Sequence, residues 1–69
     1  MMKNRISELR NKHDLTQEEL ANKVDVSRQT IISLEKGRYN PSIILAYNIS
    51  KIFGLLIEDV FLFEKEDDK

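Results

Sequence analysis

Residues 16–37 of this chain, TQEELANKVDVSRQTIISLEKG, contain the start and stop signals of two short helices. Thr16 is a good N-cap residue, and Glu19 lies three residues later, where it completes a capping box. Ser27 repeats the N-cap, and Gly37 supplies the left-handed residue that commonly ends a helix. The pattern therefore predicts one helix directly after Thr16 and a second helix between Ser27 and Gly37.

Only three residues, Asp25-Val26-Ser27, separate the two predicted helices, the first beginning at Gln17 and the second covering residues 28–36. Because the connection is so short, the helices must turn sharply against each other, which predicts a helix-turn-helix. Apolar side chains from both helices and the turn can face inward: Leu20, Ala21, Val24, Val26, Ile31 and Leu34.

Four side chains of the second helix remain on its outer face: Arg28, Gln29, Ile32 and Ser33. Arg and Gln form bidentate hydrogen bonds to guanine and adenine edges in the major groove of DNA. Ile32 is equivocal, because it can contact a thymine methyl group or another protein. We therefore expect these four side chains to read DNA bases.

The quoted stretch is similar to the signature of the Cro/phage-repressor (XRE-like) helix-turn-helix family, and the similarity continues through Pro41 and Ala46 to Phe61. The resemblance implies an all-α, five-helix, lambda-repressor-like domain that binds DNA. Asp25 stands where the family usually has glycine. Asp tolerates the left-handed backbone better than most residues, so the turn remains possible.

The resemblance also implies roles for other residues. In the family, the positions of Arg10 and Glu35 form an ion pair, although two unrelated surface charges would also fit the sequence here. The loop after the second helix grips the DNA backbone in the family, and Tyr39 could instead pack over that loop. The loop and the starts of the helices supply the expected phosphate-binding residues: Gln17, Ser27, Thr30, Arg38, Tyr39, Asn40 and Ser42.

The remaining helices follow from apolar spacing. A first helix is predicted over residues 4–12, with Ile6 and Leu9 inward. A fourth helix is expected from a Ser42 cap to Gly54, with Ile43, Ala46, Ile49 and Phe53 inward and Tyr47, Asn48, Ser50 and Lys51 outward. The fifth helix has a weak start, because Leu56 occupies the cap position.

The C-terminal segment has more apolar residues than one short helix can bury, nine of the twelve in residues 52–63. We therefore expect a homodimer with Leu55, Leu56, Ile57, Phe61 and Phe63 at or near its two-fold axis. The alternative is that Phe61 and Phe63 complete the core of the monomer. Residues 1–3 and 62–64 could pair as a small antiparallel ribbon.

Composition limits the other possibilities. The chain has 69 residues, one histidine and no cysteine, and no apolar run long enough for a membrane span or signal peptide. We expect one domain over residues 1–63, a solvated acidic tail over residues 64–69, and a cytoplasmic protein with no metal, cofactor, small-molecule ligand or ligand-binding domain. An enzyme is disfavoured because the sequence has no Gly-rich phosphate loop and no carboxylate pair in an apolar cleft.

Charge is distributed unevenly along the chain, although the formal net charge is only -1. Residues 1–51 hold nine Lys or Arg and six Asp or Glu, a balance of +3, whereas residues 52–69 hold two and six, a balance of -4. The positive part contains the helix-turn-helix, as DNA binding requires. We expect a sequence-specific transcriptional repressor that binds a dyad-symmetric operator through the major groove. The alternative is an antitoxin or anti-repressor that acts mainly by protein contact.

Overall fold

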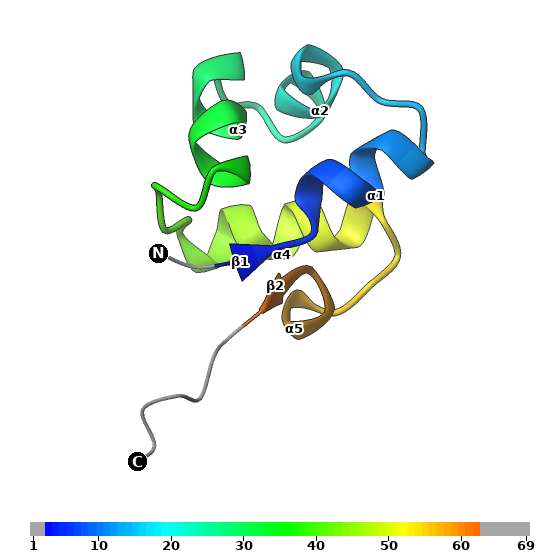
Figure 1. Ribbon diagram of the computed structural model, residues 1–69, viewed down its shortest axis with the longest axis vertical. Helices are drawn as coiled ribbons and strands as arrows, with labels where there is room; N and C mark the ends of the chain where they lie inside the picture. The colour runs from blue at the N-terminus through cyan, green and yellow to red at the C-terminus, as the bar shows by residue number, and fades with distance from the viewer. Residues whose placement is uncertain (1–2, 63–69) are drawn as a thin grey trace.

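A computed structural model describes residues 3–62, which form five helices and a two-stranded ribbon (Figure 1). The elements are β1 (Lys3–Asn4), α1 (Ile6–Lys12), α2 (Gln17–Lys23), α3 (Arg28–Glu35), α4 (Ile43–Ile52), α5 (Ile57–Val60) and β2 (Phe61–Leu62). In Figure 1, α4 crosses the molecule with α2 and α3 on one side and α5 on the other. The predicted five-helix domain with a small ribbon is confirmed.

Side-chain hydrogen bonds start α2, α3 and α4 where the sequence predicted them. The backbone N–H of Glu19 donates to Thr16 Oγ1 at 3.0 Å, and the backbone N–H of Thr16 donates to Glu19 Oε1 at 2.8 Å, which completes the capping box. The hydroxyl oxygens of Ser27 and Ser42 each accept from the backbone N–H three residues later, at 3.2 and 3.1 Å. Each bond satisfies a donor that the first turn of a helix leaves unpaired. At α5, Leu56 makes no side-chain cap bond, as expected.

Left-handed residues lie in the turns between helices. Asp25 has φ 60° in the turn between α2 and α3, so it takes the conformation predicted for the position where the family has glycine. Gly37 and Gly54 follow α3 and α4 with φ 72° and 69°. Asp14, for which no left-handed conformation was predicted, has φ 57° between α1 and α2. Local backbone preference therefore shapes all four turns.

The hydrophobic core lies between the four longer helices and is closed by the C-terminal segment. It consists of Ile6, Leu9, Leu20, Ala21, Val24, Ile31, Leu34, Leu45, Ala46, Ile49, Phe53, Val60 and Phe61. Val26 is partly buried against this cluster. None of the helices within residues 3–62 has the length and apolar content that crossing a membrane requires.

The inward stripe of α4 differs from the prediction by a rotation about the helix axis. Ile43 was expected inside but is 77% exposed, whereas Leu45 is buried. Ser50 was expected outside but is buried, and its hydroxyl donates to the carbonyl oxygen of Ala46 at 2.9 Å. That bond offsets the cost of burying a polar group. Because Ile43, Ile44 and Leu45 are all apolar, the helical period alone could not select the stripe.

The ribbon pairs the two ends of the domain. β1 runs antiparallel to β2, with Lys3 opposite Leu62 and Asn4 opposite Phe61. Because Asn4 belongs to β1, α1 begins at Ile6 rather than at residue 4 as predicted. The predicted ribbon also included residues 1–2 and 63–64, which lie outside the described residues.

Phe61 requires a correction. The side chain is 1% exposed and belongs to the core of the single chain, so the prediction that it lies at a dimer interface is wrong. The ribbon explains this placement, because pairing with Asn4 turns β2 back over the core. Phe63, also predicted at the interface, lies outside the described residues. Leu56 is 63% exposed, and Leu55 and Ile57 are partly buried against the core.

Candidate nucleic-acid interface

Helix α3 presents a polar outer face because its inner face is anchored in the core. Ile31 and Leu34 are 0% and 1% exposed, which determines the rotation of the helix about its axis. Arg28 and Gln29, in the first turn of α3, are both exposed. The other two predicted base-reading residues, Ile32 and Ser33, are half-buried.

The end of α1 and the starts of α2 and α3 border one open cavity. Its volume is about 430 Å³, and it is lined by Arg10, Thr16, Gln17, Glu18 and Arg28. The structure therefore brings Gln17, predicted to contact phosphate, onto the same surface as Arg28, predicted to read bases. This surface is concave and mainly polar, which suits hydrogen bonding to a polar ligand.

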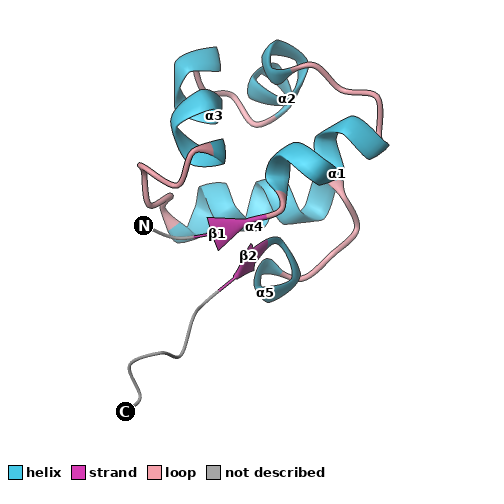
Figure 2. Cartoon of the chain, in the orientation of Figure 1, coloured by secondary structure: helices cyan, strands magenta, loops and turns pink. Residues whose placement is uncertain are grey.

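The segment between α3 and α4 adds a second group of predicted residues. It leaves the end of α3 and leads directly into α4 (Figure 2). Arg38, Tyr39, Asn40 and Ser42 are all exposed. The backbone N–H of Arg38 donates to the carbonyl oxygen of Ser33 at 3.0 Å, so the start of the loop is fixed to the last turn of α3. The loop that carries these four exposed residues thus begins beside the predicted base-reading helix and ends at the start of α4.

Three predicted phosphate ligands already have side-chain partners inside the protein. Gln17 Nε2 donates to Glu35 Oε1 at 3.1 Å. The hydroxyls of Thr30 and Ser27 are hydrogen-bonded to each other at 3.0 Å. Contact of these three side chains with phosphate stays a prediction, and for Gln17 the amide is oriented by Glu35.

The predicted ion pair between Arg10 and Glu35 is present. Arg10 Nε lies 2.8 Å from Glu35 Oε2, and the two side chains are only 13% and 9% exposed. Arg10 Nη1 also donates to the carbonyl oxygen of Leu15 at 2.8 Å. Together with the bond from Gln17, these contacts join α1, the turn before α2, the start of α2 and the end of α3. The pair therefore holds together the helices that form the candidate interface.

Asn4 is a supporting residue that was not predicted from the sequence. Its Nδ2 donates to the carbonyl oxygen of Leu34 at 2.8 Å, and its Oδ1 accepts from the backbone N–H of Ile6 at 3.1 Å. Asn4 thus joins the ribbon, the start of α1 and the last turn of α3. Asn4 was predicted as the first residue of the helix, and the preference of Asn for capping positions could have placed it before the helix and signalled the second bond. No sequence pattern predicts the first bond, which spans 30 residues.

An exposed ion pair joins Arg5, just before α1, to Glu8 in its first turn. Arg5 Nη2 is 3.1 Å from Glu8 Oε2. The hydrogen bond and positive charge of Arg5 hold the pKa of the Glu8 carboxyl below its usual value. The same contact raises the pKa of Arg5, which remains a cation.

Comparison with known proteins agrees with this architecture. A family model described as Helix-turn-helix matches residues 6–60. The HTH-type transcriptional regulator MJ0272 of Methanocaldococcus jannaschii is 54% identical over 66 residues, covering 96% of this chain and 100% of that protein. The cryptic phage CTXphi transcriptional repressor RstR of Vibrio cholerae is 33% identical over 60 residues, which cover 87% of this chain and 54% of RstR.

A solved structure extends the comparison to the fold. The restriction-modification controller protein C.AhdI from Aeromonas hydrophila superposes with a TM-score of 0.72 at 25% identity, over 80% of this chain and 83% of that one. The family match covers α1 to α5 and therefore includes the whole candidate interface. The chain belongs to the helix-turn-helix family of transcriptional regulators, as its resemblance to XRE-like proteins predicted.

Proposed function

We propose that the protein is a transcriptional repressor that binds a dyad-symmetric DNA operator as a homodimer, with α3 in the major groove. The observation that carries this proposal is the exposure of Arg28 and Gln29 on a helix whose opposite face is locked in the core. A fixed helix with free Arg and Gln side chains at its start can present both to base edges. Ile32 and Ser33, half-buried on α3, are the two further residues we propose for base contacts.

Contacts to the DNA backbone would come from the flanking segments. Arg38 offers a positive charge for a phosphate, and the exposed Asn40 and Ser42 offer hydrogen-bond donors beside it. Gln17 and Ser27 border the same surface at the starts of α2 and α3. Phosphate contacts set affinity and orientation without reading sequence, so these residues should act on all DNA alike.

The homodimer follows from the demands of specificity. One base-reading helix contacts only a few base pairs, whereas a two-fold dimer reads two half-sites about 34 Å apart, roughly one turn of DNA. The exposed Leu56 and the partly exposed Leu55 and Ile57 support a contact at the C-terminal end of the domain. RstR is a transcriptional repressor, and repression is the activity that we propose for this chain.

The proposal is tested by gel shift against genomic fragments, including the promoter of the gene that encodes the chain. We expect one or few fragments to be retained in the presence of excess random DNA. On a retained fragment, Arg28→Ala should weaken binding by about 1–3 kcal/mol and relax the preference at one base position. Arg38→Ala should weaken binding to operator and random DNA equally and reduce the salt slope by about one unit.

Two outcomes would contradict the proposal. Equal loss on operator and random DNA for Arg28→Ala would show that α3 does not read bases. Retention of no fragment at low salt would exclude DNA binding and favour the antitoxin or anti-repressor function.

A further inference from the structure

One face of the molecule exposes apolar side chains that the core does not use. Ile43, Ile44 and Tyr47 on α4 are 77%, 69% and 54% exposed, and Leu56 before α5 is 63% exposed. These are four of the six large apolar side chains that are exposed within residues 3–62. Tyr47 is four residues from Ile43 and three from Ile44, so helical geometry places the three on one side of α4.

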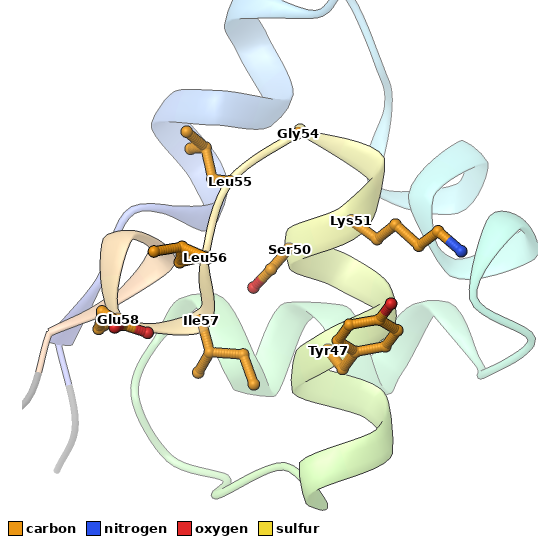
Figure 3. A pocket seen from close by; sticks show the side chains of 8 residues that line it. All are labelled: Tyr47, Ser50, Lys51, Gly54, Leu55, Leu56, Ile57 and Glu58. Atoms are coloured by element: carbon orange, nitrogen blue, oxygen red, sulfur yellow. The ribbon is translucent and has the colours of Figure 1, made fainter.

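A cavity of about 380 Å³ lies next to these residues, between the second half of α4 and residues 54–58 (Figure 3). Tyr47, Leu56 and Ile57 are among the side chains that line it. We call the surface formed by Ile43, Ile44, Tyr47, Leu56 and Ile57 the α4–α5 face. An exposed apolar surface bordered by polar residues is typical of a protein-binding site.

The two charges that border the cavity have opposite signs. Figure 3 shows Lys51 on the α4 side and Glu58 on the α5 side, with Tyr47, Leu56 and Ile57 between them. Both charged side chains are exposed, and Lys51 Nζ lies 5.8 Å from the centre of the Tyr47 ring. A two-fold contact brings each residue of a surface against the same surface of the partner. A face with a cation on one side and an anion on the other is therefore complementary to itself.

We propose that a second copy of this chain covers the α4–α5 face, with Lys51 of each copy paired with Glu58 of the other. This inference rests on the homodimer in the proposed function and specifies where that dimer forms. The sequence predicted a dimer contact through the C-terminal segment alone. The interface proposed here also includes the outer side of α4. The apolar residues supply the buried area, and the two ion pairs determine the register and the choice of partner.

The arrangement is compatible with DNA binding. α4 separates α5 from α2 and α3 in Figure 1, so a partner on the α5 side leaves the helix-turn-helix uncovered. Arg28 and Gln29 on α3 do not belong to the α4–α5 face and stay accessible. Dimer formation and base reading can therefore be perturbed separately.

Charge reversal tests the proposal by sedimentation equilibrium of the full chain without DNA. Lys51→Glu and Glu58→Lys should each weaken the dimer about tenfold or more, because each replaces two attractive pairs with two repulsive ones. The double variant K51E/E58K should restore wild-type association, since the pairs re-form with exchanged signs. Lys23→Glu, an exposed charge reversal on α2, is the matched control and should sediment as wild type. Far-ultraviolet circular dichroism verifies that each variant is folded.

The outcomes separate this inference from the proposed function. A wild-type dimer that neither single variant weakens would place the interface elsewhere, as would a double variant that stays as weak as the singles. A wild-type monomer at high micromolar concentration would overturn both this inference and the proposed homodimer. Arg28→Ala should lose operator preference in gel shift while sedimenting as a dimer, so a failure in base reading is recognised independently.

Discussion

Replacing Glu35 by alanine should destabilise the protein strongly, because it strands the positive charge of Arg10. In the native structure, Glu35 accepts from Arg10 Nε at 2.8 Å and from Gln17 Nε2 at 3.1 Å, with 9% of its side chain exposed. Removing one partner of a buried ion pair costs about 3–5 kcal/mol. We expect about 3 kcal/mol, because Arg10 is 13% exposed and keeps its bond to the carbonyl oxygen of Leu15.

A loss of that size is large for a domain of this length. At 69 residues, the free energy of unfolding should be about 3–10 kcal/mol. A loss of about 3 kcal/mol corresponds to a Tm lower by about 12–24 °C. Thermal unfolding followed by circular dichroism at neutral pH measures this shift directly.

Glu8→Ala is the matched control, because it removes a carboxylate from an exposed ion pair on the same helix as Arg10. The Arg5 and Glu8 side chains are 34% and 57% exposed, so solvent screens their attraction and the Tm should change little. The double variant R10M/E35L removes both buried charges and should stay close to wild type. If Glu35→Ala lowers the Tm no more than Glu8→Ala does, the reasoning about the buried pair is refuted.

Two further predictions concern β1 and the start of α1. Asn4→Ala removes two hydrogen bonds and should cost about 1–3 kcal/mol in urea unfolding. Asn4→Asp keeps the acceptor for Ile6 but replaces the donor to Leu34 with a carboxylate oxygen, so it should also destabilise; an Asn4→Asp variant as stable as wild type would show that the bond to Leu34 contributes nothing. Arg5 lowers the pKa of the Glu8 carboxyl in the folded state. The ion pair therefore stabilises the folded protein at pH values above the unfolded pKa of Glu8, and this contribution is lost as the pH falls through the folded pKa. Wild type and Glu8→Gln should therefore differ slightly in Tm at pH 7 and converge near pH 2; a difference that persists in acid would contradict this.

Local chemistry in the sequence was enough to predict the helix-turn-helix. The caps at Thr16 and Ser27 act within three residues, and the left-handed turn at Asp25 depends on one residue and its neighbours. The apolar spacing of the central helices admits only one inward face, so the helical period by itself places Arg28 and Gln29 outside. The Arg10–Glu35 pair came from family resemblance, because no local rule joins residues 25 positions apart.

Only the tertiary structure decided which of several apolar side chains are buried in the core. α4 could have turned either Ile43 or Leu45 inward, and the space left by the other helices selected Leu45 and buried Ser50 with it. The apolar surplus of the C-terminal segment predicted a dimer contact for Phe61, whereas the pairing of β2 with β1 places that side chain in the core. An apolar side chain can be buried equally well in its own core or against a partner, so its destination depends on the volume that the assembled helices leave unfilled.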